Sequence, residues 1–98
     1  MENSKFTTKI EETMLYVDEL SSLLFDGKII LSHGKIIGII QKLDYIIKNI
    51  EDMETVTRIE EIMFDVKELN NLMLMGKIIQ SYEKSKNILQ KLNELRKK

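Results

Sequence analysis

Lysine recurs at every seventh residue in two segments of the chain, and rows of lysine can bind the phosphate backbone of a nucleic acid. The six positions are Lys28, Lys35, Lys42, Lys77, Lys84 and Lys91. Seven residues are close to two turns of an α-helix, so each set forms a line along one side of a helix. A formal net charge of −1 and a basic content that is almost all lysine weigh against such a partner. We therefore keep a small helical nucleic-acid-binding protein as the alternative function.

Acidic residues at matching heights offer these lysines a different role. In an antiparallel helical hairpin, residues at equal height have a constant sum of residue numbers, which matches Glu12 with Lys42, Glu19 with Lys35 and Asp26 with Lys28. The acidic positions lie far round the helix from its apolar side, so we expect these lines to be solvated faces. Ion pairs on such faces contribute about 0–1 kcal/mol each.

Residue types that could do catalysis are sparse. His33 is the only histidine and cysteine is absent, so there is no thiolate nucleophile and no cysteine-ligated zinc. The residue 49 positions after His33 is Tyr82, which favours a semi-buried structural role for this position. The carboxylate pairs at 11–12 and 60–61 could suggest a Mg²⁺-dependent hydrolase, but they lack the converging partners that such a site needs. We expect no enzyme activity, no metal ligand and no cofactor.

The two halves of the chain repeat each other. Residues 50–98 align with residues 1–49 without a gap, and 21 of the 49 positions are identical. The longest identical run is Gly-Lys-Ile-Ile, at 27–30 and 76–79. We interpret the chain as a single domain, 1–98, built by tandem duplication of a hairpin of about 49 residues. Residues kept in both halves are expected to build the fold, and residues that differ are candidates for function.

Each half is predicted to form a helical hairpin. Proline is absent, and apolar residues recur three or four positions apart. Gly27 and Gly76 stand where the first helix of each hairpin should end, because glycine enters the left-handed region without steric cost. The expected helices span residues 7–25, 28–49, 56–74 and 77–96.

The helix starts and the core follow from the same pattern. Thr8 with Glu11, and Thr57 with Glu60, have the spacing of a capping box. The predicted core is made of apolar residues at helical spacing in both halves. Its members are Ile10, Met14, Val17, Leu20, Leu24, Ile29, Ile40 and Leu43, together with Ile59, Met63, Val66, Leu69, Met73, Ile78, Leu89 and Leu92.

These elements predict an all-α fold, an antiparallel four-helix bundle. The join between the halves leaves one alternative open, because residues 49–55 contain neither glycine nor proline. A single long helix over residues 28–74 would need a second chain to complete its core, which would make an intermolecular bundle in a dimer.

The back face of the second helix differs between the halves and is the candidate binding surface. In the first half it is small and apolar, with the residues Leu31, Gly34, Ile37, Gly38, Gln41 and Tyr45. In the second half the equivalent residues are Gln80, Glu83, Lys86, Asn87, Gln90 and Glu94. Glycine costs about 1 kcal/mol relative to alanine inside a helix, so two glycines four residues apart suggest close approach of another backbone. We expect a protein partner or a second copy of the chain, as a homodimer.

The first residues and the most apolar stretch of the chain indicate where the protein is expected to act. The first residues lack the basic start and apolar core of a signal peptide. The most apolar stretch, 29–50, contains four charged residues and is a poor membrane span. We expect a cytoplasmic interaction or regulatory module from a bacterium or phage, without membrane contact.

Overall fold

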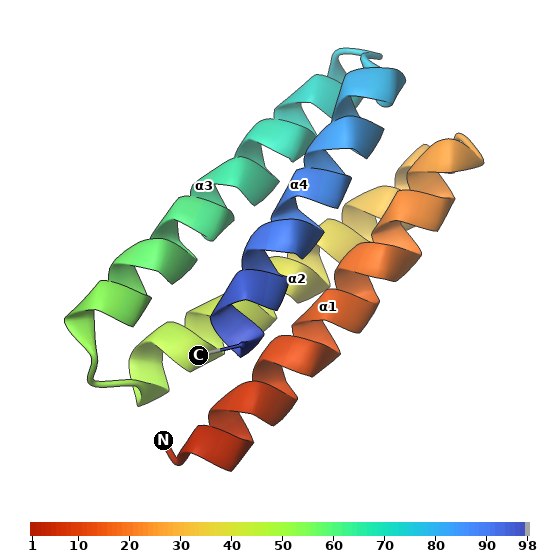
Figure 1. The fold of residues 1–98 in the computed structure, drawn as a ribbon. Helices are drawn as coiled ribbons and strands as arrows, with labels where there is room; N and C mark the ends of the chain where they lie inside the picture. Colours follow the sequence, from red (N-terminus) through yellow and green to blue (C-terminus); the bar gives the residue numbers. More distant parts are fainter. Residues whose placement is uncertain (98) are drawn as a thin grey trace.

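The computed structural model describes residues 1–97, and all of their regular structure is helical. The elements are α1 (Asn3–Phe25), α2 (Ile29–Asn49), α3 (Met53–Leu74) and α4 (Ile78–Arg96). The helices alternate in direction, so both hairpin turns lie at one end of the molecule, and the chain ends and the α2–α3 connection lie at the other (Figure 1). The predicted all-α arrangement of four helices is confirmed, and each helix boundary falls within about four residues of its predicted place.

Each helix packs against two neighbours. Helix α1 contacts α2 and α4, helix α3 contacts the same two helices, and the diagonal pairs make no close approach. The α1–α2 face and the α3–α4 face are therefore opposite sides of the bundle. The Cα atoms extend over 38 × 19 × 19 Å.

A short connection separates α2 from α3. Ile50 has φ −119° and ψ 144°, and Asp52 has φ −70° and ψ 110°. Both residues are extended, so the helical hydrogen-bond ladder stops and the chain reverses between them. The alternative of one continuous helix over residues 28–74 is wrong for this structure, because the four helices close their core within one chain.

The two glycine turns adopt the predicted conformation. Gly27 has φ 71° and Gly76 has φ 78°. In the first turn the Lys28 amide donates to the Leu23 carbonyl at 2.9 Å, and the Gly27 amide donates to the Leu24 carbonyl at 3.0 Å. The second turn repeats both bonds with the same lengths. This is the Schellman motif, which satisfies carbonyls that the helix end would otherwise leave unpaired.

Replacing Gly76 with alanine is expected to lower the free energy of unfolding by about 1–2 kcal/mol, because a Cβ atom strains the left-handed conformation. Gly34→Ala is the matched control. Gly34 lies inside α2 with a negative φ and no atom within 4 Å of an added Cβ, so alanine there should raise stability by up to about 1 kcal/mol. Urea unfolding followed by circular dichroism measures both, and equal stability of the two variants would contradict the strain at Gly76.

The predicted capping boxes do not form. Helices α1 and α3 begin at Asn3 and Met53, which places Thr8 and Thr57 about one turn inside them. Each hydroxyl instead donates to the carbonyl four residues earlier, at 3.0 Å for Thr8 and 2.9 Å for Thr57. The capping prediction is wrong because a threonine inside a helix can donate its hydroxyl to a carbonyl of the preceding turn, with no need for a helix end. The spacing of threonine and glutamate therefore does not by itself locate the start of a helix.

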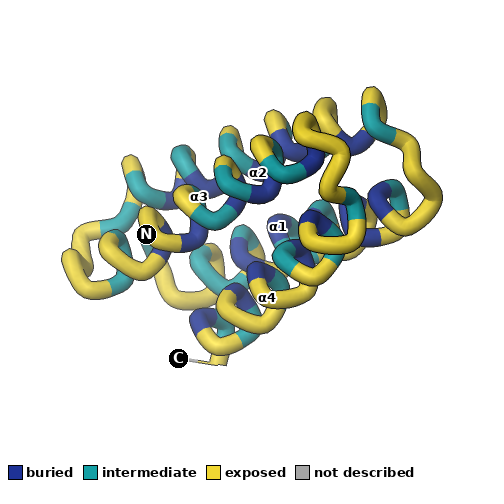
Figure 2. Tube along the Cα trace, turned by 90° about the horizontal axis from the view of Figure 1, so that it is seen from above, coloured by how far each residue is buried: buried dark blue, intermediate teal, exposed yellow. Residues whose placement is uncertain are grey.

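Buried apolar residues form one core that runs the length of the bundle, with buried positions turned inward and exposed positions outward (Figure 2). The fully buried members are Ile10, Val17, Leu20, Leu24, Ile36, Ile39, Leu43, Ile46, Ile59, Ile62, Val66, Leu69, Met73, Ile88, Leu92 and Leu95. Ten of the sixteen predicted core residues belong to this set.

The remaining predicted core residues lie at its edge. Those partly buried are Met14, Ile29, Ile40, Met63, Ile78 and Leu89. Helix α2 shows the cause, because its interior face is centred between α1 and α3. Ile39 is at that centre and fully buried, whereas Ile40 lies about 100° further round the helix. The sequence pattern contained both isoleucines and did not decide which one faces the interior.

Hydroxyl groups complete the interior where α1 meets α4. The Ser21 and Ser85 hydroxyls lie 2.7 Å apart and form a buried hydrogen bond across the two helices. Ser21 also donates to the Val17 carbonyl. These small side chains bring α1 and α4 close together, and no buried side-chain polar atom of the described residues lacks a partner.

Candidate functional site

The predicted binding residues lie together along α2, and we call them the α2 surface. They are Leu31, Gly34, Ile37, Gly38, Gln41 and Tyr45. Its large side chains are exposed: Leu31 by 59 %, Ile37 by 45 % and Tyr45 by 42 %. Gly34 and Gln41 are also exposed, and Gly38 is half-buried. Five of the six predicted residues are therefore open to a partner.

Gly38 has a role inside the molecule. A Cβ atom at this position would lie 2.9 Å from Cε2 of Tyr16, so glycine makes room for a tyrosine ring from α1. The ring lies below two lysines of α2, with Nζ of Lys35 at 4.3 Å and Nζ of Lys42 at 4.5 Å from its centroid. The close approach expected from a partner at this glycine is made by Tyr16, while Gly34 remains open.

The second half places a carboxylate where the first half has this ring. Asp65 is equivalent to Tyr16, and its carboxylate lies 3.5 Å from Nζ of Lys84 and 2.6 Å from Nζ of Lys91. Asn87 stands in the position of Gly38. The first half thus combines Tyr16 with Gly38, and the second half combines Asp65 with Asn87. This joint difference is visible in the sequence and is the signal that could have located the contact. It marks two halves that share a backbone and differ in the chemistry of one seam.

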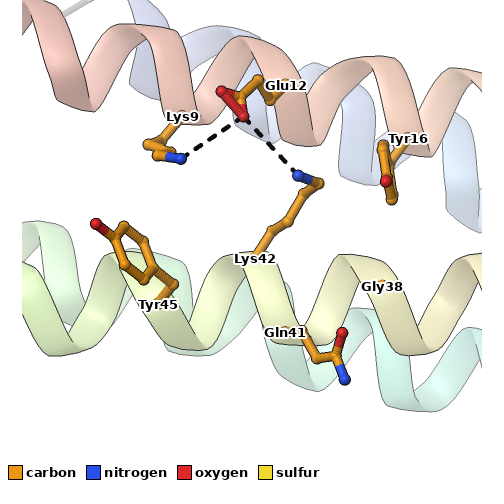
Figure 3. Close-up of a pocket in the computed structure, with 7 residues that line it drawn as sticks. All are labelled: Lys9, Glu12, Tyr16, Gly38, Gln41, Lys42 and Tyr45. Atoms are coloured by element: carbon orange, nitrogen blue, oxygen red, sulfur yellow. Dashed lines mark ion pairs between the residues drawn. The ribbon is translucent and has the colours of Figure 1, made fainter.

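A groove of about 270 Å³ lies between α1 and α2 beside the tyrosine ring (Figure 3). Its lining residues are Lys9, Glu12, Tyr16, Gly38, Gln41, Lys42 and Tyr45. Nζ of Lys9 and Nζ of Lys42 each lie 3.8 Å from the same Glu12 oxygen. Lys9 also lies 5.1 Å from the centroid of the Tyr45 ring. Two ammonium groups thus share one carboxylate between two tyrosines, which leaves an excess of positive charge in the groove.

Ion pairs join the two helices of the first hairpin at two of the matching heights, where solvated faces were expected. Lys35 Nζ lies 3.2 Å from Glu19, and Lys42 lies 3.8 Å from Glu12. The expectation of solvated faces is wrong for these two lysines, which are half-buried because the tyrosine ring lies against their stems. Two of the six regularly spaced lysines are exposed and make no ion pair with residues 1–97: Lys28 and Lys77. The other four form ion pairs within the chain, which reduces the charge they offer to phosphate.

A second groove, of about 290 Å³, lies at the equivalent place between α3 and α4. Its lining residues are Arg58, Glu61, Ile62, Lys91, Glu94 and Leu95. The basic groups of this groove pair with carboxylates outside its lining, since Arg58 lies 3.0 Å from Glu54 and Lys91 bonds to Asp65. Glu61 and Glu94 are exposed and make no ion pair with residues 1–97. The second groove therefore carries an excess of carboxylate.

Exposed apolar side chains also gather at the end of the bundle that holds both hairpin turns. They are Phe25, Ile30, Leu31, Leu74, Met75 and Ile79. Ile30 and Ile79 are 88 % and 76 % exposed and are identical in the two halves. Residues kept in both halves are expected to build the fold, and this isoleucine is an exception, because its exposure shows that the core does not need it.

Two further titratable residues, His33 and Lys48, lie outside both grooves. His33 is exposed, not semi-buried as predicted, and its Nδ1 lies 3.1 Å from Oδ1 of Asn70 in α3. The hydrogen bond with Asp44, and the charge of that carboxylate, raise the pKa of Lys48 above its ordinary value. Within residues 1–97, no three His, Cys, Asp or Glu side chains are grouped to hold a metal ion. No described helix is both long and apolar enough to cross a membrane.

Comparison of the chain with known protein families, with curated proteins and with solved structures gives no match in any of the three.

Proposed function

We propose that this protein is a small interaction module that acts by docking to another protein surface, and that it associates with itself through the α2 surface. The observation that carries the proposal is the difference between α2 and α4 at equivalent, exposed positions. Helix α2 presents Leu31, Ile37 and Tyr45 to solvent, whereas α4 presents glutamine, lysine and glutamate there.

Folding does not require these apolar side chains. The core is closed beneath them, and α4 occupies the same kind of place in the bundle with polar residues. Each of these side chains is about half exposed, so it forgoes about half of the roughly 1.5–3 kcal/mol that full burial gives, and a docked partner would recover that part. Exposed apolar residues that lie together and are not needed for the core are typical of interaction sites.

The test replaces the α2 residues with their second-half equivalents, as Leu31→Gln, Ile37→Lys and Tyr45→Glu together. We expect the unchanged chain to increase in mass with concentration by light scattering, and the triple variant to remain monomeric. Leu15→Gln with Phe64→Gln is the control, because it removes two exposed apolar side chains of α1 and α3 that lie off this surface. A triple variant with the same concentration dependence as the unchanged chain would refute docking through α2.

A further inference from the structure

The two grooves described above occupy equivalent places on opposite faces of the bundle and have complementary charge. In the α1–α2 groove, Lys9 and Lys42 share the single carboxylate of Glu12. In the α3–α4 groove, Glu61 and Glu94 have no cationic partner among residues 1–97. The first groove therefore has more ammonium groups than carboxylates, and the second has carboxylates without partners.

The same contrast extends along the whole of each face. We define the first seam by helical spacing as positions 5, 9, 12, 16 and 19 of α1 with 34, 35, 38, 42 and 45 of α2, which carry four lysines and two glutamates. The equivalent ten positions of α3 and α4 carry three basic and six acidic residues. The difference comes from four acidic residues that stand where the first half has lysine, tyrosine or glycine: Glu54, Asp65, Glu83 and Glu94. Glu83 is exposed on α4 and, like Glu94, makes no ion pair within residues 1–97.

We infer that the occupant of the α1–α2 face is the α3–α4 face of a second copy, with a glutamate of α4, Glu94 or Glu83, entering the groove beside Lys9 and Lys42. This inference rests on the proposed self-association and specifies its geometry. The second half shows the chemistry, because there a carboxylate already lies between the two lysines equivalent to Lys35 and Lys42. Contact between two α1–α2 faces would instead bring lysine against lysine.

The size of the faces supports a lateral contact. A side of the bundle measures 38 × 19 Å between Cα atoms, or about 700 Å², close to the roughly 800 Å² that each partner buries in a standard interface. The apolar end with the hairpin turns offers only 19 × 19 Å. A contact between two different faces leaves one face of each molecule free, so it generates open chains of molecules rather than closed dimers.

The test uses two variants that each disable one face. Gly34→Glu with Tyr45→Glu gives two positions of the α2 surface their second-half residues, and Glu83→Lys with Glu94→Lys reverses two charges of α4. We expect the unchanged chain to form assemblies that grow with concentration and shrink in high salt, and each variant alone to be monomeric by light scattering. An equimolar mixture should form dimers and nothing larger, because each variant supplies the face that the other lacks.

A matched control, Asp18→Lys with Glu60→Lys, also reverses two exposed charges and should assemble like the unchanged chain, because Asp18 lies with Leu89 and Arg96 between α1 and α4 and neither residue lines a groove of the two faces. Formation of dimers in the mixture also shows that both variants are folded. If the α4 variant associates like the unchanged chain while the α2 variant does not, self-association through α2 stands and the head-to-tail geometry is wrong. An unchanged chain that is monomeric at every concentration, or a mixture that stays monomeric, overturns the inference.

Discussion

Replacing Ile39 with alanine lowers the free energy of unfolding by an expected 2–5 kcal/mol, roughly the cost of removing a fully buried aliphatic side chain and leaving a cavity. Ile39 lies at the centre of the interior face of α2. Domains of this size are stable by only about 5–15 kcal/mol, so this loss is a large fraction of the total. Thermal and urea unfolding followed by circular dichroism measure it, with an expected fall in melting temperature of roughly 10–30 °C.

Ile40 provides a matched control for this result, because it has the same side chain in the same helix. It is only partly buried at the edge of the core, so Ile40→Ala should cost about half as much or less. The sequence pattern placed Ile40 in the core, and the structure places Ile39 at its centre. A larger loss at Ile40 than at Ile39 would show that α2 is rotated about its axis relative to the arrangement described above.

The second large effect is expected at Gly38, where alanine should cost about 1–3 kcal/mol relative to Gly34→Ala. The two glycines lie four residues apart in the same helix, so the gain in helix propensity is the same for both. They differ in that a Cβ atom at Gly38 meets the ring of Tyr16 at 2.9 Å, whereas one at Gly34 meets nothing within 4 Å. The ring lies against the ammonium groups of two lysines and cannot turn aside without losing those contacts.

A double-mutant cycle separates this contact from other effects of the substitution. Tyr16→Asp with Gly38→Asn copies the pair found in the second half, and the carboxylate can then bond to Lys35 and Lys42 as Asp65 bonds to their equivalents. We expect the double variant to be more stable than the sum of the single changes by about 1–3 kcal/mol. Additive effects in urea unfolding would mean that Tyr16 and Gly38 do not interact.

The sequence alone determined the parts of the structure that depend on local interactions. The spacing of apolar residues gave four helices in nearly their observed places, since that spacing is set by the helical turn itself. Gly27 and Gly76 marked the hairpin turns because only the left-handed backbone closes them. The constant sum of residue numbers in an antiparallel hairpin brought Glu12 to the height of Lys42, although the sequence favoured solvated faces over the ion pair that forms.

Only the tertiary structure decided how the helices are rotated and which side chains meet across them. Ile39 faces the core, Tyr16 fills the space left by Gly38, and Asp65 takes the place of that ring in the second half. These contacts join residues far apart in the chain, and a change of a few tens of degrees in helix rotation would replace them with others. A periodic pattern defines the direction of the apolar side of a helix only to within a few tens of degrees. Close packing between the helices therefore sets the rotation of each helix and the side chains that face the core.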